Sequence, residues 1–186
     1  MTRFLFALRQ GWLFRREIKQ LALTSKITNV TQLELSYLIA KKIKVLALDF
    51  DGVLASHGQV QPDEEVVIWL NALRETSIKL ALLSNKPNQA RRQYFQTAFP
   101  ELLFIAGFPK KPYPQGLLAI AQHFKVQPQE VFLADDRLLT GVLASCLAGT
   151  QVAYVCPARQ NFKARWLEES FFEVVRCVER WIMIGR

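Results

Sequence analysis

The chain has 186 residues and a formal net charge of +8, and 51% of its residues are hydrophobic. A chain of this length fits one domain with a proper core, and this apolar content excludes an intrinsically disordered chain. Its three cysteines, Cys146, Cys156 and Cys177, are too widely spaced for a disulfide framework or a zinc site, so we expect buried, reduced thiols.

The first 44 residues are strongly basic, with nine Lys or Arg residues and only two Glu. Aromatic and aliphatic side chains lie between the first of these cations at near-helical spacing. We interpret residues 1–40 as a basic amphipathic segment and residues 41–186, which include a C-terminal helix, as the main domain. Arginines interrupt the apolar residues too often for a membrane span, and no clean apolar core with a cleavage site marks a signal peptide.

Three interpretations of this N-terminal segment are open. It is a helix packed on the domain with solvated cations, or residues 1–25 associate peripherally with an anionic membrane, or the cations bind nucleic acid. The sequence holds no recognised nucleic-acid motif, so no nucleic acid is expected as a partner. The expected location is the cytoplasm, either free or peripheral at the inner face of the membrane.

Two carboxylates mark the end of the first strongly apolar run of the main domain. Asp49 and Asp51 follow residues 45–48, and Gly52 allows a sharp turn just beyond them. Because side chains alternate along an extended strand, a regular strand directs both aspartates to one side. Charges this close repel unless one takes a proton or a cation lies between them, and Mg²⁺ prefers carboxylate oxygens. The pair indicates a nucleophile and a general acid beside Mg²⁺; solvated acids in a strand-to-loop turn are the alternative.

Three later segments carry similar groups at a strand end or a helix start: Ser84 and Asn85 after residues 80–83, Lys111 before a proline-initiated helix, and Asp135 and Asp136 after residues 131–134. A hydroxyl, an amide and an ammonium group can hold a phosphate, and paired acids can hold a metal ion. Taken singly, each is equally well a helix cap or a solvated loop residue. Four such segments in this order favour one shared site.

Apolar runs alternate with helical patterns along the main domain. We predict strands over residues 45–49, 79–83, 102–105, 130–134 and 151–155, and helices over residues 63–76, 88–98, 113–124, 137–148 and 162–183. This alternation predicts an α/β protein with a three-layer, Rossmann-like open parallel sheet. Right-handed crossovers bring the carboxyl ends of such strands to one edge, where ligands bind, so the four polar segments are predicted to meet there.

In these four segments the chain resembles the haloacid dehalogenase (HAD) superfamily of phosphatases, whose four motifs match in order over roughly residues 45–155. It is most similar to the subclass IIIA, YqeG-type phosphatases on Leu83-Ser84-Asn85-Lys86, Lys110-Lys111-Pro112, Asp136-Arg137-Leu138-Leu139-Thr140 and Arg176-Cys177-Val178-Glu179-Arg180. Relatives in that group include phosphatases acting on phosphatidylglycerophosphate. The resemblance therefore implies a lipid phosphate as one substrate to test.

The resemblance implies a Mg²⁺-dependent phosphomonoester hydrolase that forms an aspartyl-phosphate. Asp49 is its expected nucleophile and Asp51 its general acid and base, and the groups expected to bind the phosphoryl group are Ser84, Asn85 and Lys111. The expected metal ligands are Asp49, Asp51 through its backbone carbonyl, Asp135 and Asp136. Two alternatives remain: a phosphatase of a soluble sugar phosphate or nucleotide, and a non-catalytic protein of this fold that binds a partner.

One position departs from the subfamily pattern, which usually has a second acid after the threonine of its fourth motif. This chain has Gly141 there. We expect Asp135 to be the direct metal ligand, with Asp136 ligating or acting through water.

The spacing of the motifs bears on access to the site, since only 33 residues separate Asp51 from Ser84 and 27 separate Ser84 from Lys111. Each interval must hold a helix and a strand, so we expect an open site with no large cap domain.

Overall fold

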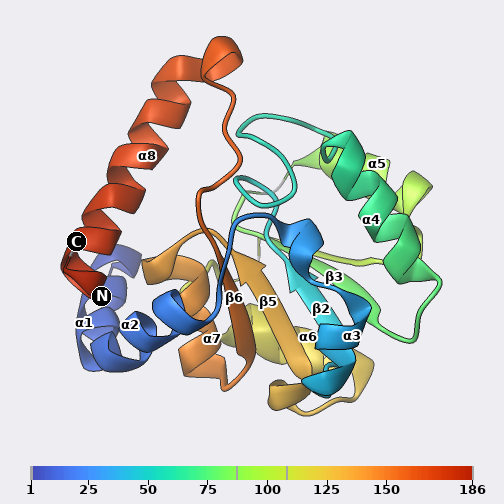
Figure 1. Ribbon diagram of the computed structural model, residues 1–186, viewed down its shortest axis with the longest axis horizontal. Helices are drawn as coiled ribbons and strands as arrows, with labels where there is room; N and C mark the ends of the chain where they lie inside the picture. Colours follow the sequence, from blue (N-terminus) through green and yellow to red (C-terminus); the bar gives the residue numbers. More distant parts are fainter. Residues whose placement is uncertain (1, 87, 108, 186) are drawn as a thin grey trace.

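Six parallel strands form one sheet in the order β1-β6-β5-β2-β3-β4, in a computed structural model that describes residues 2–86, 88–107 and 109–185 (Figure 1). The strands are β1 (Lys26–Ile27), β2 (Val45–Leu48), β3 (Lys79–Ser84), β4 (Leu103–Ala106), β5 (Val131–Asp135) and β6 (Gln151–Val155). Every pairing is parallel, so the carboxyl ends of the strands meet at one edge. The predicted α/β, Rossmann-like open sheet is confirmed.

Helices cover both faces of this sheet. They are α1 (Arg3–Leu13), α2 (Arg15–Thr24), α3 (Leu35–Ala40), α4 (Glu64–Arg74), α5 (Gln89–Ala98), α6 (Gln115–Phe124), α7 (Leu143–Ala148) and α8 (Phe162–Ile184), with short turns η1 (Val30–Gln32), η2 (Pro128–Glu130) and η3 (Leu138–Val142). The five predicted strands and four of the predicted helices lie within two residues of these bounds, and the helix predicted over residues 137–148 covers the turn η3 together with α7. Within the described residues no separate cap domain covers the sheet, as expected.

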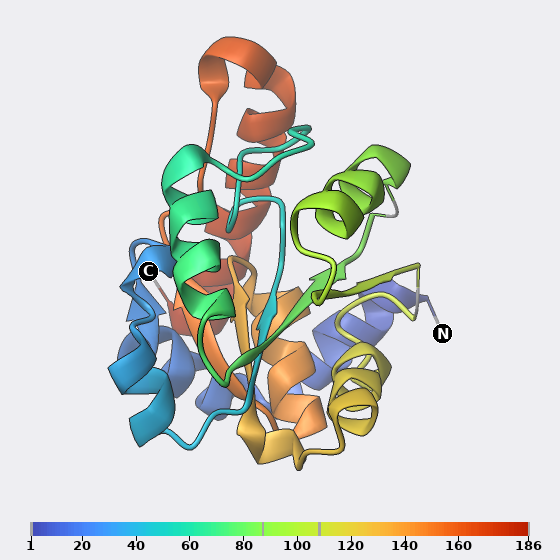
Figure 2. The same ribbon diagram turned by 90° about the vertical axis from the view of Figure 1, so that its right-hand side faces the viewer.

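Alternation of side chains along each strand divides the core into two layers. Leu46 and Leu48 of β2 pack in a cluster with residues of α4 and α5, while Val45 and Ala47 pack in a second cluster with residues of α2, α6 and α7. In Figure 2, α4 and α6 accordingly lie on opposite sides of the sheet. Because both faces are buried, the strands are continuous apolar runs in the sequence.

The N-terminal segment packs on this core. Ile18 and Ala22 of α2 are buried in the second cluster, and β1 pairs with β6 as an edge strand of the sheet. The strand β1 was not predicted, because it is only two residues long and Lys26 is exposed. Phe4 and Trp12 of α1 point outward and are 69% and 65% exposed. The division of the chain at residue 40 stays a prediction.

The long helix α8 turns its polar residues inward and much of its apolar stripe outward. Its buried side chains include Glu169, Arg176 and Glu179, whereas the side chains that face solvent include Phe171, Val174, Val178 and Trp181. A helix normally buries its apolar face, so an exposed apolar stripe of this kind is typical of a surface that binds a partner or a membrane. α8 rises past the carboxyl edge of the sheet (Figures 1 and 2), which brings its inward polar residues to that edge.

The cysteines differ partly from expectation. All three are free, but Cys177 on α8 is exposed, and Cys146 and Cys156 are only half-buried. Separately, among the helices of the described residues, none is both long and apolar enough to cross a bilayer.

Candidate active site

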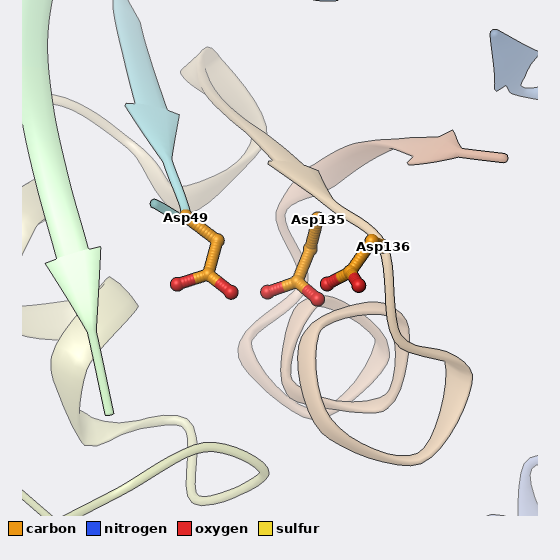
Figure 3. Close-up of side chains that lie close together, drawn as sticks. All are labelled: Asp49, Asp135 and Asp136. Atoms are coloured by element: carbon orange, nitrogen blue, oxygen red, sulfur yellow. The ribbon is translucent and has the colours of Figure 1, made fainter. Parts of the chain in front are cut away.

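Three carboxylates converge at the carboxyl edge of the sheet. Asp49 follows β2, Asp135 ends β5 and Asp136 comes next, and each offers an oxygen within 4.8 Å of the other two (Figure 3). β2 and β5 are neighbours in the sheet, with Leu48 opposite Ala134. Strand pairing therefore places acids that are far apart in the sequence side by side.

Two buried cations face this cluster. The Lys111 Nζ lies 3.0 Å from an oxygen of Asp49 and 2.5 Å from an oxygen of Asp135, and the Arg176 Nε lies 2.6 Å from an oxygen of Asp136. Lys111 and Arg176 are each 2% exposed. Three carboxylates thus share two buried cations, and of the three only Asp49 is appreciably exposed.

The pKa values of the cluster reflect its burial. Desolvation raises the pKa of Asp49 to about 6 against the opposing charge of Lys111, and raises that of Asp136 to about 6 against the opposing charge of Arg176. Desolvation also raises the pKa of Asp135. Burial alone would lower the pKa of Lys111, but the charges of Asp135 and Asp49 outweigh it, so the pKa lies above its ordinary value and the lysine stays charged.

Asp51 lies apart from the three clustered carboxylates. Its two oxygens accept hydrogen bonds of 2.9 and 2.6 Å from the guanidinium of Arg91, which is buried against the ring of Phe50. Burial would raise the pKa of Asp51, but the hydrogen bonds and charge of Arg91 outweigh it and lower the pKa. In this arrangement Asp51 is ionised and paired, whereas the sequence predicted a carboxyl ready to donate a proton.

Ser84 and Asn85 lie where β3 ends, on the other side of Asp49. The Ser84 hydroxyl is within hydrogen-bond distance of the backbone N–H and C=O of Lys86, at 3.3 and 3.2 Å. The Asn85 amide oxygen accepts from the backbone N–H of Lys111 at 2.8 Å, and its amide nitrogen donates to the backbone oxygen of the same residue at 3.3 Å. Asn85 thus positions the segment that carries the buried lysine.

Two glycines leave room for the carboxyl groups of Asp135 and Asp136. Gly52 has φ +84°, and a Cβ there would lie 2.5 Å from an oxygen of Asp136. At Gly141, in the π-helical turn η3, a Cβ would lie 1.9 Å from the carboxyl carbon of Asp135. π-helical turns are rare and frequent at functional sites. Asp135 therefore fills the space that a side chain at position 141 would need.

The cluster opens into a pocket of about 240 Å³. Its lining includes the predicted Asp49, Asp51, Ser84, Asn85 and Asp136, and five cations: Arg3, Lys86, Lys110, Arg137 and Arg176. Lys111 and Asp135 lie behind this wall. Lys111 forms ion pairs with both Asp49 and Asp135. Within the described residues the two terminal nitrogens of Arg176 are buried without a hydrogen-bond partner, and one of them lies 3.6 Å from a carboxylate oxygen of Glu173. A pocket so rich in cations suits an anionic ligand.

Sequence reasoning assigned no role to several residues that build this site. Glu179 of α8 accepts hydrogen bonds from the backbone N–H of Leu138 and Leu139 and pairs with Arg137, so α8 fixes η3. His57 is 4% exposed and lines the pocket, and its Nδ1 lies 2.9 Å from a carboxylate oxygen of Glu169. The resemblance pointed to residues 176–180, but only the folded chain shows what they contact.

A family comparison matches this arrangement. The profile of a hydrolase family, haloacid dehalogenase-like hydrolase, matches residues 5–145, which is well over half of the chain and includes the N-terminal helices. The chain belongs to the haloacid dehalogenase-like hydrolases. The prediction of an enzyme of this superfamily is therefore confirmed. No curated protein matches the sequence.

Solved structures show the same fold. An uncharacterized protein from Listeria monocytogenes serotype 4b is similar with a TM-score of 0.54 and 12% identity, over 64% of this chain and 83% of that one. A hypothetical protein from Xanthomonas campestris has a TM-score of 0.51 and 19% identity, over 72% and 75%. The cobalt-bound deoxy-D-mannose-octulosonate 8-phosphate phosphatase from Haemophilus influenzae has a TM-score of 0.51 and 17% identity, over 78% and 91%. At these identities the likeness concerns the fold.

Proposed function

We propose that this protein is a Mg²⁺-dependent phosphomonoester hydrolase of subclass IIIA that forms an aspartyl-phosphate on Asp49. The observation that carries the proposal is the cluster of Asp49, Asp135 and Asp136 at the sheet edge, beside a cationic pocket, with Lys111 bridging two of the carboxylates behind the pocket wall. Phosphatase activity in a fold neighbour, the octulosonate 8-phosphate phosphatase, is consistent with it.

The donor set fits a hard divalent cation. The three carboxylates pair with two buried cations, Lys111 and Arg176, and burial raises the pKa values of Asp49 and Asp136 in spite of these cations. Mg²⁺ prefers carboxylate oxygens and retains several waters. Asp49, Asp135 and Asp136 would hold it, with the backbone carbonyl of Asp51 as a further ligand. When bound, it would offset negative charge on the phosphoryl group.

The first step would be attack of a carboxylate oxygen of Asp49 on phosphorus. The bond from phosphorus to the ester oxygen breaks, and the leaving oxygen takes a proton from Asp51. Lys111 would keep Asp49 oriented through its 3.0 Å ion pair, and Ser84 and Arg176, which line the pocket, would bind phosphoryl oxygens. Most of the rate gain in such chemistry is positioning and charge stabilisation.

In the second step, water attacks the aspartyl-phosphate, gives a proton to Asp51 and releases phosphate and the free Asp49. This role requires Asp51 to take up a proton, which its pair with Arg91 opposes. The proposal therefore includes an opening of the Arg91–Asp51 pair during turnover. Arg91 also donates to the backbone oxygen of Gln59 at 2.8 Å, so the loop after β2 would move with it.

For the substrate, we propose a lipid phosphate such as phosphatidylglycerophosphate. Two features support an interfacial substrate: the outward apolar stripe of α8, and the exposed Phe4 and Trp12 of α1 beside basic residues of α1 and α2. An apolar face with adjacent cations is typical of proteins that bind an anionic membrane surface. A soluble sugar phosphate or nucleotide is the alternative that the tests below separate.

The enzyme proposal predicts metal-dependent release of phosphate from p-nitrophenyl phosphate, stopped by a chelator. Mg²⁺ should also stabilise the folded protein because it relieves repulsion in the cluster. At a hundred times its dissociation constant, the gain is about 2.7 kcal/mol, read as a rise in melting temperature. Asp136→Asn should reduce this rise. A chelator-resistant activity, or no Mg²⁺ effect on either quantity, would contradict the proposal.

Membrane association predicts co-sedimentation with vesicles that contain phosphatidylglycerol and much weaker binding to vesicles of phosphatidylcholine alone. Replacing the exposed cations Arg9, Arg16 and Lys19 by Gln should weaken binding on the order of 10²-fold at low salt, since each contributes about 1 kcal/mol. Ile68→Ala, on the distant α4, is the control and should bind like the wild type. Equal binding of the triple variant and the wild type would refute a membrane role for this segment.

A further inference from the structure

A second cavity adjoins the candidate active site. It has a volume of about 510 Å³ and lies between α1 and α8, next to η3. Its walls are mainly apolar and include Ala7 and Leu8 of α1, Leu139 of η3, and Val175 and Val178 of α8. α1 and the C-terminal half of α8 lie on the same side of the molecule (Figure 1). We call this cavity the α1–α8 groove.

The groove shares part of its wall with the polar pocket. Arg3, Arg137, Thr140 and Phe172 line both cavities, so the boundary between them carries two arginines. On one side of this boundary are the carboxylates and Arg176, and on the other are aliphatic side chains. The change from polar to apolar walls across two adjoining cavities matches a molecule with a phosphate at one end and a hydrocarbon chain at the other.

The groove is held open by packing and charge rather than by a mobile loop. A Cβ at Gly11 of α1 would lie 3.3 Å from Met183 of α8, which shows close approach of the two helices at one end of the groove. At the other end, Glu179 binds η3 and Arg176 binds Asp136, so α8 is fixed over the site. Binding of a hydrocarbon chain to exposed apolar walls of this kind lowers the free energy, because it removes apolar surface from water.

We infer that the α1–α8 groove is the binding site for the hydrocarbon chain of the substrate, a phosphomonoester with a long apolar tail. This inference rests on the proposed function and adds a location and a selectivity to it. The phosphate lies beside Asp49, between Ser84 and Arg176. The arginines at the boundary lie along the polar head, and the chain extends between α1 and α8. The groove opens beside the exposed apolar residues of both helices, so a chain can enter from a lipid surface.

The test is the rate of hydrolysis of ethyl, hexyl and dodecyl phosphate, each below its critical micelle concentration, so that no lipid surface is present. For the wild type, kcat/KM should rise with chain length by at most about fourfold per methylene, and in total on the order of 10²-fold or more. Val175→Trp fills the groove and should reduce the dodecyl-to-ethyl ratio to below about tenfold. Val178→Trp, at a more exposed wall position, is the second variant in case the first fails to fold.

The matched control is Ile68→Trp, the same kind of enlargement at an exposed position of α4, and it should keep the wild-type ratio. A ratio near one in the wild type, or an equal ratio in the groove variants, overturns the inference while hydrolysis of ethyl phosphate still supports the proposed function. Calorimetric binding of ethyl and dodecyl phosphate to Asp49→Asn separates the two claims further. Tighter binding of the dodecyl ester, lost when Val175→Trp is added, supports the groove. If the wild type hydrolyses no ester, that result overturns the proposed function but not the groove. Absence of both hydrolysis and preference overturns both.

Discussion

Asp49→Asn should abolish turnover and leave the fold intact. An amide is a very poor nucleophile, and loss of a group that forms the covalent intermediate lowers kcat on the order of 10⁴-fold or more. The change should not lower stability. Because burial raises the pKa of Asp49 from 3.8 to about 6, the ionised carboxylate opposes folding as the pH rises through that range. Lys111 meanwhile keeps Asp135 as its partner.

Two measurements check this expectation. Phosphate release gives the loss of activity, and thermal unfolding in chelator at pH 7 should give a melting temperature equal to or above that of the wild type. The stability difference should vanish below pH 3.8, where Asp49 is protonated in both states. Asp63→Asn is the matched control, since Asp63 pairs with Arg159 away from the cluster and should leave activity unchanged. A folded Asp49→Asn protein with wild-type activity would remove the nucleophile assignment.

Much of the fold followed from patterns that depend on local chemistry alone. The buried strands were apolar runs because both sheet faces are covered, and parallel topology then required Asp49, Ser84 and Asp135 to share an edge. α8 was harder, because its apolar stripe has the period of a helix that docks on a core, and the period does not say which face turns inward. Glu169, Arg176 and Glu179 face inward because each has a partner in the site.

The pairing of Asp51 with Arg91 could not be predicted either. Forty positions separate these residues, and nothing in the spacing of Arg91 on α5 marks it as the partner of a motif residue. The sequence placed Asp51 correctly at the strand exit, but its charge state depends on a contact made by a distant helix. Roles that depend on a pKa are therefore less predictable from motifs than the positions of the same residues.

The largest effect after Asp49 is expected at the pair Asp135 and Gly141. An acid is usual at position 141 in the resembling subfamily, and the structure gives a physical reason for its absence here. A Cβ at position 141 would overlap the Asp135 carboxyl group, at 1.9 Å from its carbon and 2.2 Å from an oxygen. Asp135 is fully buried and binds Lys111. Its carboxylate, at the end of the strand, occupies the space that an acid at position 141 would otherwise fill.

This geometry predicts a reciprocal rescue. Gly141→Asp alone should cost about 3–5 kcal/mol of folding free energy, because a second carboxylate is forced against a buried one. Asp135→Gly alone leaves Lys111 with one partner and should lower kcat by about 10²–10³-fold. The double variant Asp135→Gly/Gly141→Asp should regain at least about tenfold in kcat over Asp135→Gly, and most of the stability lost in Gly141→Asp, because the coupling of contacting sites is non-additive.

The control exchanges the neighbouring acid instead. Asp136 pairs with Arg176 and is not among the atoms nearest to a Cβ at position 141, so Asp136→Gly should not relieve Gly141→Asp. Denaturant unfolding and phosphate release, measured on the wild type and on all five variants, complete both cycles. If the two cycles show the same coupling energy, the overlap at Gly141 is not what excludes an acid there. A coupling confined to Asp135 would show that this chain carries its second acid on the strand and needs glycine at position 141 to hold it.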